Sequence, residues 1–351
     1  MIKVEIKKLE NSEVEITGAI PAEIFDTHRE QAIKNLGENI ELQGFRKGHV
    51  PEDILEKHLG EPAILEEMAE ITIGKEYKNI VRDNDLNPIS RPNIAITKVA
   101  MGNPLEFKAT ITVMPQIVVG DYKKIAKEVY AKDEEVTVSE QELEETLTEI
   151  RTMHAKQAEQ TKKKDSDVKK GEGEEEKPEL PELNDEFVKG LGDFKDVADF
   201  KKKLKENIRS EKEQKEVDKK RINMMEKILN DSKVELPRVI IDAELNKMIA
   251  QFRSDVEKMG MSFEDYIKNS KKTEEDIRKE FEKEAKKKAS FQLILNKIST
   301  EEKLIADKKE VAAQVATLMK QYPKAQEENV RVYVESNLLN QKVFDFLEEQ
   351  K

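Results

Sequence analysis

The chain has 351 residues, which is enough for two or three domains. Charged residues make up 39% of it, hydrophobic residues 37% and aromatic residues 5%, a balance that favours amphipathic helices over an enzyme with a large dry core. The net charge of −12 argues against a protein that coats nucleic acid, although a local basic patch could still contact RNA. The absence of Cys excludes a disulfide scaffold, a thiol nucleophile and a Cys-based metal site.

No targeting or membrane segment is evident in the sequence. The first residues, Met1–Ile6, already alternate like a strand, and no basic stretch precedes an apolar one. No run reaches the roughly 18 apolar residues that span a bilayer. The sequence therefore predicts a soluble cytoplasmic protein with no membrane partner.

Residues 1–115 are predicted to form an α+β domain. Apolar and polar residues alternate near residues 4–6, 14–16 and 94–96, as in half-buried strands. A strict two-residue repeat over Leu105–Val113 predicts a strand with one packed face and one wet face.

Prolines mark the predicted helices of this domain. Pro21 is expected to open a helix that runs to about Ile40. Pro51 and Pro62 can each occupy a first helical turn, where the missing N–H costs nothing, and Gly60 ends the helix between them.

The middle of the chain is predicted to connect two bodies. Residues 116–138 look extended, and a helix then begins where Ser139 and Glu142 can form a capping box. We expect residues 116–160 to comprise this connector and a helix that packs with the C-terminal body. Residues 161–182 are mostly charged, with Gly and Pro and almost nothing to bury, and are predicted to be a solvated linker.

Residues 183–351 are predicted to be all helix. One helix follows Pro237, with apolar residues at helical intervals, and stops at Gly260. Further helices are expected over about 301–321 and 325–349.

A search for catalytic chemistry finds little. No H-E-x-x-H pair, no G-x-x-x-x-G-K-[ST] phosphate loop and no G-x-S-x-G elbow occurs. The abundant carboxylates are typical of solvated helix faces. The sequence therefore predicts no catalytic residue, no metal site and no cofactor. The four histidines, none of them in a recognisable ligand pattern, are His28, His49, His58 and His154.

One short segment, Gly44–Pro51, differs from the rest. It carries an aromatic residue and two cations between glycines and a proline, which restrict the backbone at a turn. Arg46 can grip phosphate or carboxylate with a bidentate fork, Lys47 adds a compact charge, and Phe45 can pack on a partner surface or stack on a base. An ordinary interhelical loop is the alternative reading of these residues alone.

This segment resembles the ribosome-binding motif of bacterial trigger factor, G-F-R-x-G-x-x-P. His49 stands where the family usually has Lys, a departure that affects the electrostatic part of docking. The resemblance implies that Phe45, Arg46 and Lys47 dock beside the nascent-chain tunnel. The whole predicted ribosome-binding site comprises Gly44, Phe45, Arg46, Lys47, Gly48, His49 and Pro51.

The resemblance extends along nearly the whole chain outside the charged linker. Met114-Pro115, Leu183–Val188 and Val234–Asp242 resemble successive family landmarks. It implies an α+β N-terminal ribosome-binding domain followed by an all-α C-terminal chaperone domain, in an elongated multi-domain molecule. The family's prolyl isomerase domain usually stands where residues 161–182 lie, and that interval is too short to bury a core. We therefore expect no isomerase activity.

The resemblance implies an ATP-independent chaperone that docks at the ribosomal tunnel exit, on its protein and nearby rRNA. It would hold nascent or unfolded polypeptides, and a homodimer off the ribosome is a further expectation. Adaptable Met and aromatic side chains in the C-terminal half suit promiscuous contact, although helical spacing alone also predicts their burial. The candidate client-binding residues are Met248, Phe252, Met259, Met261, Phe263, Tyr266 and Met319.

Three rival interpretations stay open at this point. The first is a periplasmic-type holding chaperone with a similar helical body that does not bind ribosomes. The second is a helical scaffold without clients, and the third is a cryptic isomerase.

Overall fold

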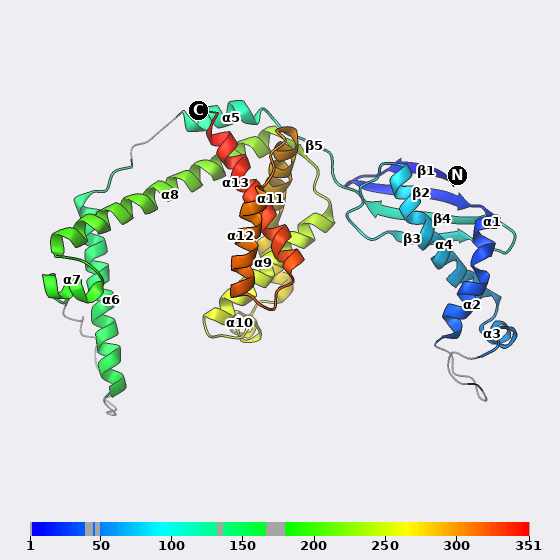
Figure 1. Ribbon diagram of the computed structural model, residues 1–351, viewed down its shortest axis with the longest axis horizontal. Helices are drawn as coiled ribbons and strands as arrows, with labels where there is room; N and C mark the ends of the chain where they lie inside the picture. The colour runs from blue at the N-terminus through cyan, green and yellow to red at the C-terminus, as the bar shows by residue number, and fades with distance from the viewer. Residues whose placement is uncertain (1, 39–44, 46–49, 132–135, 166–179, 351) are drawn as a thin grey trace. The chain divides into compact units, whose positions relative to one another are not determined.

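The computed structural model describes residues 2–38, 45, 50–131, 136–165 and 180–350 (Figure 1). The chain divides into two compact units, each assembled from segments that are far apart in the sequence. The first unit comprises Met1–Gly120 with Leu229–Val343, and the second comprises Asp121–Ile228 with Phe344–Lys351.

Four strands form an antiparallel sheet in the first unit. They are β1 (Lys3–Lys8), β2 (Glu13–Ile20), β3 (Asn93–Lys98) and β4 (Leu105–Thr112), in the order β1-β2-β4-β3. Every second residue of β4 from Leu105 to Ile111 is buried, which confirms the predicted packed face. A Cβ atom on Gly18 would lie 2.8 Å from the Phe107 ring, so β2 needs a glycine where that ring crosses it.

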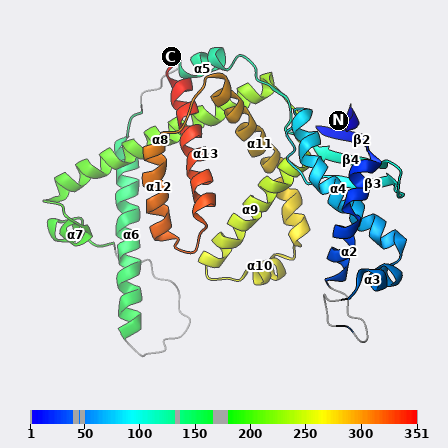
Figure 2. The same cartoon turned by 45° about the vertical axis from the view of Figure 1, so that its right-hand side comes forward.

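Helices cover one face of this sheet (Figure 2). Phe25 and Met68 from the helices are buried in one core with Phe107 from the sheet. The helix predicted from Pro21 is divided, because a 3₁₀ turn separates its two parts, and its expected end near Ile40 lies outside the described residues. The elements are α1 (Ala22–Phe25), the 3₁₀ turn η1 (Asp26–His28), α2 (Arg29–Gly37), α3 (Glu52–Leu59) and α4 (Glu61–Asp83).

The rest of the first unit is mainly helical. Its elements are a short strand pair, β5 (Ile117–Val118) with β6 (Lys233–Val234), and then α9 (Arg238–Lys258), α10 (Phe263–Ser270), α11 (Glu274–Glu301), α12 (Lys308–Gln321) and α13 (Glu327–Glu348) up to Val343. Two expectations were wrong in detail. Residues 183–351 are not all helix, since β6 is a strand, and the helix expected from about 301 begins at Lys308.

Side-chain caps define several of these helix starts. Thr273 and Asp276 form a capping box at the start of α11, in which each side chain bonds the other's backbone N–H. Ser262 caps α10 by accepting from the Asp265 N–H. Asp307 caps α12 by accepting from two backbone N–H groups, and this cap fixes the helix start that the sequence prediction misplaced.

The second unit is built from helices around a long central one. They are α5 (Tyr122–Tyr130), α6 (Glu140–Asp165), α7 (Asp185–Leu191), α8 (Val197–Asp231) up to Ile228, and the end of α13 from Phe344. The prediction that residues 116–138 are extended was wrong over α5, whose start is capped by Asp121. Helix α6 continues to Asp165, inside the interval predicted as a linker, and residues 166–179 lie outside the described part of the chain.

A small apolar core joins α6, α7 and α8. Leu143, Leu147, Val188 and Phe200 are its buried members. Ion pairs flank this core: Glu144 with Lys201 at 2.9 Å, Glu140 with Lys205 at 3.1 Å, and Glu142 with Lys212 at 2.7 Å. The apolar stripe of α6 therefore faces α7 and α8, and complementary charges pair α6 with α8 beside it.

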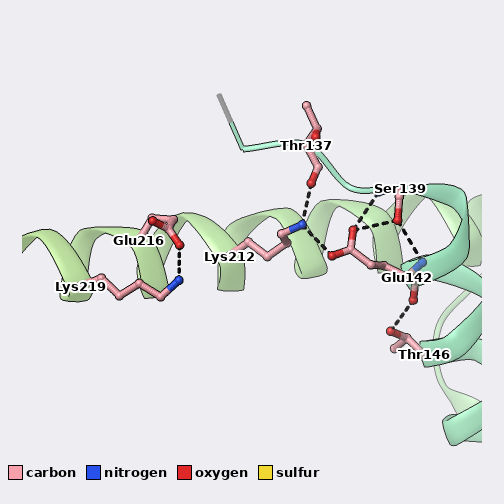
Figure 3. Close-up of polar contacts among 7 residues, drawn as sticks. All are labelled: Thr137, Ser139, Glu142, Thr146, Lys212, Glu216 and Lys219. Carbon is pink, nitrogen blue, oxygen red and sulfur yellow. Dashed lines mark hydrogen bonds and ion pairs between the residues drawn. The ribbon is translucent and has the colours of Figure 1, made fainter. Parts of the chain in front are cut away.

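Glu142 is the most connected of these acids (Figure 3). Its Oε2 accepts from the backbone N–H and the hydroxyl of Ser139, and its Oε1 accepts from Lys212 Nζ. Lys212 Nζ also donates to the Thr137 carbonyl at 2.7 Å, which ties the chain before α6 to α8. These bonds, the Lys212 bond first, lower the pKa of Glu142 to about 2.

Candidate functional site

The segment that the sequence singles out lies between α2 and α3. Of its predicted binding residues, the structure describes Phe45 and Pro51, while Gly44 and residues 46–49 lie outside the described part of the chain. Phe45 is 38% exposed, which leaves part of its ring accessible to a partner. Pro51 is exposed and precedes the first residue of α3.

Buried residues anchor the α3 end of this segment. Val50 and Leu55 are 8% and 5% exposed and belong to the core of the α+β domain. A Cβ on Gly37 would lie 2.6 Å from Leu55 Cδ1, so the end of α2 approaches α3 closely enough that only glycine fits without a shift. The two helices that flank the segment are therefore packed directly on each other.

Arg29 links the same helices to α4. Its guanidinium donates to both carboxylate oxygens of Glu61, at 2.7 and 2.8 Å, and lies 3.3 Å from Glu56. The bond to Glu61 raises the pKa of Arg29, and the same bond lowers the pKa of Glu61. Such a bidentate pair fixes the relative orientation of the two side chains. The contacts of Arg29 with Glu56 and Glu61 therefore tie α2, α3 and α4 together at the base of the segment.

The predicted client-binding residues differ widely in exposure. Met259 is 84% exposed and Met261 is 40% exposed, whereas Phe263 is only 2% exposed. Phe263 is thus a core residue in this conformation, with Arg253 stacked 4.6 Å from its ring centroid. The half-buried members are Met248, Phe252, Tyr266 and Met319.

The structure brings some of these residues together. The Phe252 ring makes edge-on contacts with Phe263, Tyr266 and Phe281, at centroid distances of 6.2, 5.1 and 5.6 Å. Met319 stands apart from them, because it packs against the small core of α12 and α13.

A shallow groove of about 390 Å³ runs between α9 and α11. Its apolar lining is Met248, Phe252 and Phe281. Its polar lining includes neighbours that neutralise each other, Glu244 with Lys247 and Glu284 with Lys288. Because the charges at the rim pair with each other, they exert little net field on a ligand. The apolar floor can therefore bind an apolar side chain with an affinity that depends little on the ligand's own charge.

Sequence reasoning missed several apolar residues that line the groove or are exposed. Phe281 is half-buried and lines the groove. Tyr322, directly after α12, is 62% exposed, and on α13 Val332 is 59% exposed and Tyr333 is 61% exposed. The adjacent Val332-Tyr333 pair breaks the amphipathic pattern of α13, a signal that the sequence did contain.

Two searches of the described residues complete the description of the site. None of the helices described is long and apolar enough to cross a bilayer. Within the same part of the chain, no three His, Asp or Glu side chains converge as metal ligands would.

Comparison with known families matches two models to this chain. The model described as bacterial trigger factor protein matches residues 2–150, and the model of the bacterial trigger factor C-terminus matches residues 196–351. The matched ranges flank residues 151–195, which contain the predicted linker.

Curated relatives match over their full lengths. A trigger factor of Halalkalibacterium halodurans is 24% identical, with 98% of this chain and 97% of the relative covered. A trigger factor of Bacillus subtilis is also 24% identical, with both chains covered completely. The latter alignment runs over 432 positions, more than the 351 residues of this chain, so it includes relative residues that this chain lacks.

A solved structure has a similar fold. It comes from work entitled "Promiscuous Substrate Recognition in Folding and Assembly Activities of the Trigger Factor Chaperone". The match has a TM-score of 0.52 at 16% identity and covers 98% of this chain and 99% of the other. At that identity the match shows the fold, an α+β region followed by a mainly helical one, as the sequence predicted.

Proposed function

Because the chain belongs to the trigger factor family and is a ribosome-associated chaperone, we propose that it docks through the segment between α2 and α3 and holds unfolded chains on its helical body. The observation that carries the docking half is the exposed ring of Phe45 on a segment whose flanking helices are packed together. A rigid base lets a short segment present its side chains without a large ordering cost on binding.

The docking residues have complementary tasks in this proposal. Phe45 packs on an apolar patch of the tunnel-exit protein. Arg46 and Lys47 pair with carboxylates or with nearby rRNA phosphate, where a guanidinium fork and an ammonium both bind well. Gly44, Gly48, His49 and Pro51 complete the motif that carries the family resemblance.

The groove between α9 and α11 supports the holding half of the proposal. Met248, Phe252 and Phe281 offer an adaptable apolar floor, and the exposed Met259 and Met261 lie beyond the end of α9. Several weak contacts of this kind bind an unfolded or nascent chain by multivalency and release it as its own folding competes. No nucleotide is needed, and the sequence has no phosphate-binding loop.

The chain carries chaperone activity without prolyl isomerisation in this proposal. The interval where an isomerase domain would stand is short and charged, and it contains no aromatic residue between Gln160 and Glu182. An isomerase pocket needs a buried apolar wall, which such a composition cannot build. We place the protein in the cytoplasm, with a homodimer as its form off the ribosome. The family assignment does not favour the periplasmic alternative.

Ribosome co-sedimentation tests the docking site. We compare the wild type with a triple variant, Phe45→Ala/Arg46→Ala/Lys47→Ala. The chain offers a matched control in Leu9→Ala/Lys7→Ala/Lys8→Ala, since Leu9 is an exposed apolar residue next to two exposed lysines in the same domain. We expect the first variant to lose most binding and the control to keep it. Equal binding by the two variants would remove the site assignment.

Two further assays separate the remaining activities. Suppression of aggregation of an unfolded substrate should persist in the triple variant when ribosomes are absent, because the groove is untouched. A proline-containing peptide should isomerise at the background rate, and catalysis above that rate would contradict the proposed absence of isomerase activity.

A further inference from the structure

The sheet of the α+β domain ends at β3. This strand pairs with β4 on one side, and among the described residues no strand pairs with its other side. An open strand edge presents backbone donors and acceptors that can template another strand, and proteins normally protect such edges.

The two isoleucines of β3 lie on the packed face of the sheet. Ile94 is opposite Ala109 and Ile96 is opposite Phe107, and both partners are fully buried. Yet Ile94 is 38% exposed and Ile96 is 36% exposed. The apolar face of the sheet therefore continues past the area that the helices cover, as a narrow strip along the edge.

The backbone direction at this edge follows from the register. The Ile89 N–H, in the segment that leads into β3, donates to the Thr112 carbonyl of β4 at 2.8 Å. The backbone groups of Thr112 therefore point toward β3. Because backbone direction alternates along an antiparallel strand, Thr110 and Lys108 face β3 as well. Their partners Asn93 and Ala95 use their backbone groups in that ladder, which directs the N–H and C=O of Ile94 and Ile96 toward the open edge.

The two edges of the sheet differ in charge. On β1, the opposite edge, the side chains exposed on the solvent face of the sheet are Lys3, Glu5 and Lys7. On β3 no charged residue occurs from Asn93 to Thr97, and Lys98 follows only at the irregularity where the ladder ends. One edge has the charges that discourage strand addition, and the other lacks them over five residues.

We propose that the edge of β3 from Asn93 to Thr97 binds an extended, uncharged segment of an unfolded polypeptide as an added strand. The segment would pair with the backbone of Ile94 and Ile96 and lay every second, apolar side chain on their exposed strip. An uncharged segment fits because a charge placed against this edge would lose water without gaining a partner. The inference rests on the proposed chaperone function and adds a client site outside the helical body.

Amide hydrogen exchange tests the proposal directly. The probe is a ten-residue peptide of alternating Val and Thr, added in excess to the full-length wild-type chain. We expect the Ile94 and Ile96 amides to exchange roughly tenfold more slowly with peptide bound, because open-edge amides become hydrogen-bonded. Slowed exchange confined to α9 and α11, or no slowing at β3, would overturn the proposal.

Edge variants supply a second readout. Ile94→Lys places a charge on the strip, and Ala95→Lys places one on the opposite, solvent face of β3, where the fold tolerates it. We expect either charge to weaken peptide binding about tenfold or more, measured by fluorescence anisotropy. The matched control is Ile6→Lys on β1, which should bind the peptide like the wild type. Equal affinity for all four proteins would refute the edge site.

The same proteins separate this inference from the proposed function. Ile94→Lys should keep ribosome co-sedimentation, while the Phe45/Arg46/Lys47 alanine variant should keep the slowed exchange at β3. If the peptide does not slow amide exchange at β3 but the wild type still binds ribosomes and suppresses aggregation, the edge site alone is wrong. Dimerisation that protects β3 without peptide, seen by sedimentation, would assign the edge to a second copy of the chain and contradict the proposal.

Discussion

The guanidinium of Arg29 faces the carboxylate of Glu61 squarely, with Nη1–Oε1 at 2.7 Å and Nη2–Oε2 at 2.8 Å. The pair joins the start of α2 to the start of α4, on either side of the segment that carries Phe45 and the shorter helix α3. Its geometry needs a planar fork, which lysine cannot supply.

Arg29→Lys should therefore weaken the base of the docking segment. Because the Arg29 side chain is 27% exposed and that of Glu61 is 48% exposed, we expect a coupling of only about 0.5–1 kcal/mol. A double-mutant cycle with Glu61→Gln, followed by denaturant unfolding, measures it. Arg82→Lys is the control, since Arg82 and Asp83 are both largely exposed, and its effect should be near zero. A coupling energy near zero between Arg29 and Glu61 would mean that the bidentate pair is dispensable for stability.

Gly18→Ala should destabilise the α+β domain. The new methyl group would lie within 3.0 Å of the Phe107 ring and of Val4 Cγ1, and the Phe107 ring is buried in the core with no room to move. We expect a loss of roughly 1–3 kcal/mol in the free energy of unfolding. Gly74→Ala is the matched control on α4, where a Cβ meets nothing within 4 Å, and it should stabilise by about 0.5–1 kcal/mol. The same sign for both substitutions would contradict the packing argument.

The titration of Glu142 should be displaced far to the acid side. Its pKa of about 2, against the usual 4.5, arises first from Lys212 and then from Ser139. A lowered folded-state pKa contributes stability that is present above about pH 4.5 and is lost as the pH falls toward 2. Lys212→Met should raise this pKa, as read by carboxyl carbon NMR shifts.

Lys219→Met is the control for that experiment. Lys219 lies about two turns beyond Lys212 on α8 and pairs with Glu216, so its removal should leave the Glu142 titration unchanged. A wild-type Glu142 that titrates near 4.5 would show that the Lys212 contact does not persist in solution.

Substitutions at exposed and at buried client-binding candidates should differ in their effect on the free energy of unfolding. Met259→Gln and Met261→Gln remove exposed apolar surface, so unfolding should change by no more than about 0.5 kcal/mol while aggregation suppression falls. Phe263→Ala should cost about 3–5 kcal/mol, because it empties a buried site beneath the Arg253 stack. Glu257→Gln, at an exposed position of α9, controls for surface change without loss of apolar area.

Local patterns predicted much of the fold. The alternation over Leu105–Ile111 and the Thr273–Asp276 box involve residues within a few positions of each other, so the sequence displays them directly. Helix α5 was missed although Asp121, which accepts from the Lys124 N–H, is a recognisable cap before a 3.6-residue pattern.

Other features depend on partners that are distant in sequence. Strands β5 and β6 pair Ile117 with Val234, and two residues of strand carry no periodicity of their own. Phe263 was assigned to a client surface because residue type suits both roles, and only its packing on Phe252 shows that it is buried. The proposed docking segment stands out by its composition alone, which departs from that of its surroundings, and its role stays a prediction.

Arg151, halfway along α6, donates from Nε to the carbonyl of Pro181 at 2.8 Å. The polypeptide that departs at the end of α6 is thus brought back against the same helix, and Leu183 then joins the core beside Leu143 and Leu147. The residues before and after the intervening stretch are therefore both attached to α6, whatever that stretch contains. A folded domain inserted between these two attachments would therefore leave α6 and its apolar core in place, which makes the junction a site where protein engineers can graft one.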